Sequence, residues 1–150
     1  MQVTARVDYA VRAVVQLAAA GGSLSRGDIA AAQGVPPKFL EAILLQLRQA
    51  GLLVAQRGTA GGYALARPAD AITVADVVRV VDGPLAAVRG LPPEDTEYPE
   101  PAARLRDLWV ALRAGMRLVL ETTTIADLAA GALPAEVAAL LADDGAWVRR

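Results

Sequence analysis

Two short helices joined by a tight glycine turn, with a glycine-tipped hairpin directly after them, constrain the fold of this 150-residue chain more than any other feature. The first helix is expected to begin at Ser25, because Ser25 and Asp28 have the spacing of a capping box, in which each side chain binds a free amide of the first turn. Gly34 ends this helix. Pro36 and Pro37 then suit the first turn of a second helix, where amide protons lack intrahelical partners.

The second helix is expected to have one buried and one free face. Its apolar side chains recur at the spacing of a single helical face, namely Leu40, Ile43, Leu44 and Leu47. Residues 52–57 and 63–66 are expected to form the two strands of a β-hairpin, with its tip at residues 58–62. This order of elements is that of a winged helix-turn-helix. We therefore expect a mainly α-helical fold with a small β-hairpin wing and a long dimerisation helix.

A helix with a free polar face can enter the DNA major groove, about 12 Å wide, and an arginine at the edge of a hairpin can reach the neighbouring minor groove. The net charge is −1, but residues 1–68 carry seven basic and three acidic side chains, whereas residues 69–150 carry eight and thirteen. Taken by itself, this uneven distribution of charges could arise by chance. The order of the helices favours the interpretation that the positive half binds DNA. We expect a DNA-binding domain at 1–68 and a dimerisation and signal-response region at 69–150.

The chain contains neither cysteine nor histidine. Disulfides, and metal or iron–sulfur sites built from thiolate or imidazole ligands, are therefore excluded, and we expect no cofactor and no metal. No apolar run approaches the roughly 20 residues of a membrane span, and the N-terminus lacks the form of a secretory signal. We expect a cytoplasmic protein without membrane association.

Enzymatic activity has little support in the sequence. There is no histidine or cysteine, no serine in an elbow motif, and hence no candidate catalytic residue. The glycine loop at 58–62 lies between two strands, so it lacks the helix N-terminus that a nucleotide phosphate site would use. We expect the chain not to be an enzyme.

The second half predicts further helices around a long loop. Capping boxes open helices at Thr73 and at Thr124, and another helix is expected at 134–142. Residues 90–101 contain four prolines and four acidic residues, so we expect an exposed, mobile loop without a regular element.

A long helix is expected at about 102–122. Its apolar residues fall at steps of three or four, the pattern typical of two packed helices. These residues are Leu105, Leu108, Leu112, Met116 and Val119. They either form a dimer interface or cover the chain's own core, and the DNA argument favours the dimer.

The chain resembles the Rrf-type (IscR/NsrR/CymR-like) family of bacterial winged-helix transcriptional regulators over nearly its whole length. The motifs that carry the resemblance are Phe39-Leu40-Glu41, Leu47-Arg48-Gln49-Ala50-Gly51-Leu52, Arg57-Gly58-Thr59-Ala60-Gly61-Gly62-Tyr63, Ala71-Ile72-Thr73, Asp82-Gly83-Pro84 and Thr122-Thr123-Thr124-Ile125-Ala126-Asp127-Leu128. The resemblance implies a homodimer whose long helices cross and which binds an imperfect palindrome of double-stranded DNA. We expect a repressor.

Carried over by position, the resemblance assigns the DNA contacts to two segments. They are Pro36, Lys38, Phe39, Glu41 and Ala42 in the recognition helix, and Arg57, Gly58 and Thr59 in the wing. Lys38 can contact guanine or a phosphate, and Glu41 can accept a hydrogen bond from cytosine N4. Phe39 either meets a thymine methyl or packs within the protein.

Cluster-binding members of the family carry three cysteines between the fourth and the long helix, where this chain has Val88-Arg89-Gly90 and the acidic loop. The resemblance is therefore to a cysteine-free member without an iron–sulfur cluster, nearest in pattern to the cysteine-metabolism repressor branch. Some members of that branch act with a cysteine-synthase partner responsive to O-acetylserine. A small-molecule effector and such a synthase are thus candidate partners.

Several side chains near the acidic loop allow two interpretations. Trp109 either lines an effector pocket beneath the loop or belongs to the core. Arg104, Arg106 and Arg113 either bind a small anion or pair with the carboxylates of the loop. For the whole chain, the alternative to a DNA reader is a protein-interaction module that retains the winged helix without specific DNA binding. Replacing Lys38 or Arg57 by alanine distinguishes the two functions, because a DNA reader should lose affinity and a pure interaction module should not.

Overall fold

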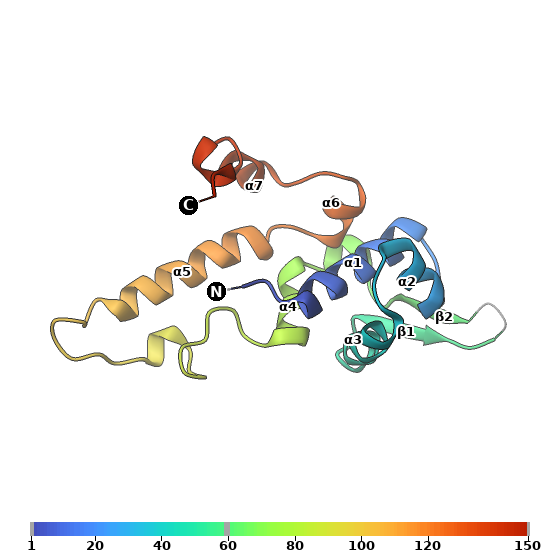
Figure 1. Cartoon of the computed structure of the whole chain (residues 1–150), viewed down its shortest axis with the longest axis horizontal. Helices are drawn as coiled ribbons and strands as arrows, with labels where there is room; N and C mark the ends of the chain where they lie inside the picture. The colour runs from blue at the N-terminus through green and yellow to red at the C-terminus, as the bar shows by residue number, and fades with distance from the viewer. Residues whose placement is uncertain (1, 59–60, 150) are drawn as a thin grey trace.

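The fold is mainly helical with a single hairpin, as the sequence predicts (Figure 1). The computed structural model describes residues 2–58 and 61–149. The elements in chain order are α1 (Ala5–Ala20), α2 (Arg26–Gln33), α3 (Pro37–Gln49), β1 (Leu53–Gln56), β2 (Gly62–Leu65), η1 (Ala69–Ala71), α4 (Val74–Asp82), η2 (Pro93–Asp95), α5 (Leu105–Leu120), α6 (Ile125–Ala129), α7 (Ala135–Leu140) and η3 (Asp144–Trp147).

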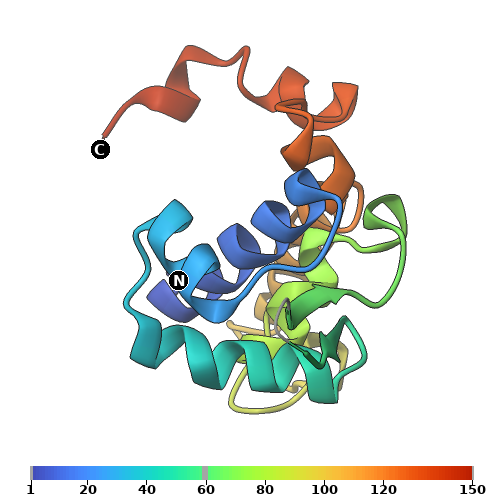
Figure 2. The ribbon, with the colours of Figure 1, turned by 90° about the vertical axis from the view of Figure 1, so that its right-hand side faces the viewer.

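One hydrophobic core holds the N-terminal helices together, and α1 runs through its middle (Figure 2). α1 packs against α2, α3, α4 and α6. The core continues beyond residue 68, because Ile72, Val77 and Ile125 are fully buried in the same cluster. The head of the molecule, defined here as α1–α4, the hairpin and α6, is therefore built from two separated parts of the chain.

The turn between α2 and α3 forms as predicted. The hydroxyl of Ser25 accepts a hydrogen bond from the amide of Asp28, and the Asp28 carboxylate accepts one from the amide of Ser25. Gly34 adopts the left-handed conformation, with φ 60°, which glycine reaches without the steric cost that a side chain brings. Val35 follows in the core, and Pro36 caps α3.

The hairpin is an antiparallel pair in which Leu53 lies opposite Leu65 and Gln56 opposite Gly62. Two backbone hydrogen bonds between Leu24 and Tyr63, of 3.0 and 2.8 Å, attach the return strand to the segment before α2. Gly62 is required by this attachment, since a Cβ atom there would lie 2.2 Å from the carbonyl oxygen of Leu24. The wing is thus fixed to the helix-turn-helix by the backbone.

The chain leaves the head after α4 and returns to it at α6. The amide of Val74 donates to the carbonyl oxygen of Thr123 at 2.9 Å, and the amide of Ile125 donates to that of Ile72, also at 2.9 Å. Between these points α5 extends away from the head (Figure 1). Both α4 and α6 open on the predicted capping boxes.

The acidic loop differs from the sequence expectation of an exposed segment without a regular element. It contains the short 3-10 helix η2, and Pro93 and Thr96 are buried. The hydroxyl of Thr96 donates to the carbonyl oxygen of Pro93 at 2.6 Å, and Arg113 of α5 pairs with Glu94 at 2.6 Å. Most of the loop is exposed, as predicted, but the expectation of no regular element was wrong, because these prolines fit a 3-10 turn and the Glu94 carboxylate has a cation to bind.

Candidate nucleic-acid interface

α3 separates its side chains as the sequence predicts. Leu40, Ile43, Leu44 and Leu47 are buried at 0–1% exposure. The predicted DNA contacts of this helix, Pro36, Lys38, Phe39, Glu41 and Ala42, are all exposed. Phe39 is 59% exposed, so packing within this chain does not account for it. The face of α3 that carries these residues is thus free to enter a DNA groove.

Arg26 is a residue of this surface that sequence reasoning missed. Its Nη1 lies 2.7 Å from Oε2 of Glu41, and both side chains are exposed. Arg26 is the first residue of α2, so its distance from Glu41 depends on how α2 and α3 cross, which no local motif encodes. The positive charge of Arg26 neutralises the carboxylate of Glu41, whose oxygens can still accept hydrogen bonds.

The wing residues lie at the end of the hairpin. Arg57 and Gly58 are exposed and directly follow β1, whereas Thr59, the third predicted wing contact, lies outside the described residues. Neither Arg57 nor Lys38 pairs with a carboxylate among the described residues (2–58 and 61–149). Both cations are therefore available to phosphates or bases.

The predicted dimer stripe lies along α5, and α5 contains no buried residue among those the structure describes. Leu108 is 55% exposed, and the other members of the stripe, Leu105, Leu112, Met116 and Val119, are half-buried. A stripe that covered the chain's own core would be buried. The described protomer thus covers this apolar helix face only in part.

Trp109 belongs to a hollow rather than to the buried core. It is half-buried, donates a hydrogen bond from Nε1 to the hydroxyl of Tyr98 at 3.1 Å, and lines a hollow of about 330 Å³. The other lining residues are Ala86, Ala87, Val88, Arg89 and Leu112.

The three arginines singled out in the sequence have different partners. Arg113 pairs with Glu94 of the acidic loop, as one of the two interpretations expects. Arg104 and Arg106 instead pair with Asp107 of their own helix, at 2.7 and 3.4 Å. Arg104 and Asp107 have the three-residue spacing of one helix face, and Arg106 is the direct neighbour of Asp107, so the loop is not the partner of either arginine.

The winged head and the exposed face of α3 define the class of helix-turn-helix transcriptional regulators. A family model described as "Rrf2: Iron-dependent Transcriptional regulator" matches residues 3–131, and the chain belongs to this Rrf2 family. Its members are DNA-binding transcriptional regulators of bacteria and not enzymes.

Relatives span nearly the whole chain. Rv1287 of Mycobacterium tuberculosis, whose name describes an HTH-type transcriptional regulator, is 54% identical over 146 residues, which cover 96% of this chain and 90% of the relative. The HTH-type transcriptional regulator CymR of Bacillus subtilis is 36% identical over 131 residues, covering 86% of this chain and 90% of CymR.

Solved structures agree on the fold. The structure of CymR, named as the global cysteine regulator of B. subtilis, superposes with a TM-score of 0.74 and 34% identity, covering 87% of this chain and 98% of CymR. The T. potens IscR structure superposes with a TM-score of 0.69 and 28% identity, covering 100% of this chain and 93% of IscR.

The iron in the family's description has no thiolate or imidazole ligands here, since the whole sequence lacks cysteine and histidine. Within the described ranges, no group of three or more histidine, cysteine, aspartate or glutamate side chains could hold a metal ion. The chain is thus an Rrf2 regulator whose residues do not fit an iron–sulfur cluster. A membrane span is likewise missing from its described helices, since none is both long and apolar enough.

Proposed function

We propose that this Rrf2 regulator is a homodimeric repressor that binds an imperfect palindrome of double-stranded DNA. The observation that carries the proposal is the exposed face of α3, backed by its buried apolar stripe and flanked by the wing. Such a helix can lie in the major groove while the hairpin reaches the adjacent minor groove.

Each predicted contact has a role that follows from its chemistry. Lys38 binds guanine O6 or N7, or a phosphate, and Phe39 meets a thymine methyl. Glu41 accepts from cytosine N4, for which its Arg26 pair must open or turn; an exposed pair, worth about 0–1 kcal/mol, permits this. Arg57 enters the minor groove or binds its phosphates. Pro36, Ala42, Gly58 and Thr59 complete the contact surface that we propose.

The dimer part of the proposal rests on α5. Its apolar stripe is open in the single chain, and pairing with the same stripe of a second chain would remove it from water. Two heads held in this way would read half-sites about one or two helical turns apart, each turn roughly 34 Å.

A link to cysteine or sulfur metabolism is the finer part of the proposal. It is supported by the absence of cysteine from the chain and by the similarity to CymR, a protein named as a global cysteine regulator. In this proposal the signal arrives through a small-molecule effector or a cysteine-synthase partner, at the half of the molecule that contains the acidic loop and α5.

Fluorescence anisotropy tests the proposal directly. The purified protein is titrated onto duplexes from the region upstream of its own gene and onto scrambled duplexes, at about 150 mM salt, where non-specific contacts are weak. A preference of roughly a thousandfold for the upstream duplex supports a specific regulator. Equal, weak binding to both would contradict it and would favour the protein-interaction module.

A further inference from the structure

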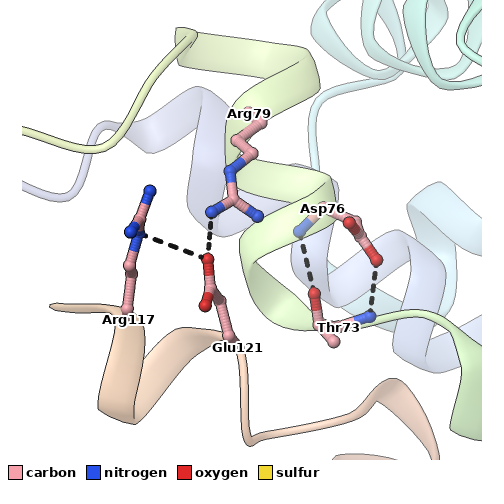
Figure 3. A network of polar contacts seen from close by, with 5 residues as sticks. All are labelled: Thr73, Asp76, Arg79, Arg117 and Glu121. Atoms are coloured by element: carbon pink, nitrogen blue, oxygen red, sulfur yellow. Dashed lines mark hydrogen bonds and ion pairs between the residues drawn. The ribbon is translucent and has the colours of Figure 1, made fainter. Parts of the chain in front are cut away.

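Three arginines from two helices border one hollow between the head and α5. Arg79 comes from α4, and Arg113 and Arg117 come from α5; the hollow measures about 360 Å³ and is closed on one side by Pro84 and Leu85. Figure 3 shows Arg79 of α4 and Arg117 of α5 directed at the same oxygen of the Glu121 carboxylate. This arrangement is separate from the exposed face of α3 and from the Trp109 hollow.

The guanidinium groups have hydrogen-bonding capacity to spare. Each arginine carries five N–H donors, whereas the ion pairs here join Arg79 and Arg117 to Glu121, and Arg113 to Glu94. Arg113 is the most enclosed of the three, at 15% side-chain exposure. Bringing three cations together is unfavourable unless anions compensate them, and two carboxylates compensate only part of the charge.

We propose that this hollow binds a small dianion, such as hydrogen phosphate or a short dicarboxylate, through Arg79, Arg113 and Arg117. Glu94 competes with such a ligand for Arg113, because its carboxylate already pairs with this arginine from the acidic loop. When Glu94 is displaced, the three cations and Glu121 leave a charge that a dianion neutralises.

Two further observations support Glu94 as the internal competitor. The hydrogen bond from Arg113 holds the pKa of Glu94 below its ordinary value, as expected for a carboxylate that pairs with a cation. The side chain of Glu94 is 52% exposed and belongs to the loop, so it can leave Arg113 without opening the core. Glu121, in contrast, bridges Arg79 and Arg117 and remains in the site.

The site connects the head to the long helix. α4 contributes Ala75, Val77 and Val81 as buried residues of the head, whereas α5 has none among the residues described. A dianion bound to Arg79 and to the two α5 arginines would therefore hold α5 at one angle to the head. The effect on DNA binding rests on the proposed function above; binding of the anion does not.

Isothermal titration calorimetry on the full-length protein tests the binding, with potassium phosphate and sodium succinate as probes at constant ionic strength. At least one probe should bind the wild-type protein, and which one binds distinguishes phosphate from dicarboxylate. Arg79→Gln and Arg117→Gln should each weaken binding by roughly tenfold, the loss expected for one charge-assisted contact. Arg104→Gln removes the same charge elsewhere on the chain, at a 92% exposed side chain, and should bind as the wild type does.

Removing the charge of Glu94 should change the affinity for the probe in the opposite direction. Glu94→Gln should raise the affinity for the bound probe several-fold, whereas Glu97→Gln, an exposed position of the same loop, should not. No binding of either probe, or equal losses in Arg104→Gln and Arg117→Gln, would overturn the site. If a probe binds but leaves the DNA affinity unchanged, only the proposed effect of the anion on DNA binding is overturned. If the wild-type protein binds a probe but shows no specific DNA binding, the proposed function is overturned and the anion site stands.

Discussion

Arg26 and Glu41 join the two helices of the helix-turn-helix by an ion pair of 2.7 Å at the exposed side of α3. Because both side chains are exposed, the pair contributes at most about 1 kcal/mol to the free energy of unfolding. Its importance lies instead in charge, since it neutralises the one carboxylate of the surface that we propose to face DNA.

We predict that Arg26→Gln lowers DNA affinity by roughly tenfold, because the uncompensated Glu41 carboxylate would then face the phosphates. The thermal unfolding midpoint should change little. Anisotropy titrations of Arg26→Gln, Glu41→Gln and the double variant check this. The double variant should regain part of the affinity, because the phosphate repulsion is gone and a glutamine amide oxygen at position 41 can still accept from cytosine N4; an equal loss in the single and double variants would mean that Arg26 binds DNA itself.

The apolar stripe of α5 predicts the oligomeric state. Leu108→Glu should convert the dimer to monomer, because it places a charge in the paired stripe, and the helix content of the monomer should persist since Leu108 is 55% exposed. Sedimentation velocity measures the state and circular dichroism the helix content. Leu118→Glu is the matched control, at a 44% exposed leucine outside the three-and-four spacing. A monomeric wild type would refute the α5 dimer.

The close approach of Gly62 to Leu24 predicts a stability effect. Gly62→Ala should lower the free energy of unfolding by about 1–3 kcal/mol, since the added Cβ would overlap the Leu24 carbonyl and push the wing from the head. Urea denaturation measures the change. Gly22→Ala, where an added Cβ meets nothing within 4 Å, should change it much less. Equal values for the two variants would show that the hairpin shifts without cost.

Asp127 predicts a dependence of stability on pH. Its pKa lies below the ordinary 3.8, because the hydroxyl and the amide of Thr124 donate hydrogen bonds to its carboxylate. As the pH falls, Asp127 therefore takes up its proton at a higher pH in the unfolded chain than in the folded one. The contribution of its carboxylate to the free energy of unfolding is complete above about pH 4 and is lost as the pH falls further.

Asp127→Asn should accordingly reduce the difference between urea midpoints measured at pH 6 and near pH 3. Asp70→Asn, at an exposed position of η1, serves as the control. If the two variants show the same pH dependence as the wild type, the Asp127 cap does not contribute as described.

The features that the sequence predicts well are local ones. Ser25 and Asp28 lie three residues apart, as do Thr124 and Asp127, so their caps depend only on helix geometry. The apolar spacing of α3 likewise fixes which face is buried. α5 begins at Leu105 rather than at about 102, a boundary that periodicity leaves open.

The features that the sequence misses depend on how distant elements pack. Arg26 and Glu41 are brought together by the crossing of α2 and α3. The pairing of Arg113 with the acidic loop was one of two sequence interpretations, and only the folding of the loop along α5 decides it. In the same way, Arg79 meets Glu121 only because α4 and the end of α5 lie side by side (Figure 3). Charge composition alone suggested solvated side chains at these positions.

The most direct test of the central claim, that the exposed face of α3 reads DNA, is the affinity of Lys38→Ala for the upstream duplex. Lys38 is exposed and is the chain's single lysine, so its removal should leave the fold intact and cost roughly 1–3 kcal/mol of binding free energy if it contacts a base. Arg104→Ala, which removes a charge of the same sign far from α3, should bind as the wild type does. Unchanged affinity in Lys38→Ala, with specific binding intact, would contradict the assignment of α3 as the reading helix.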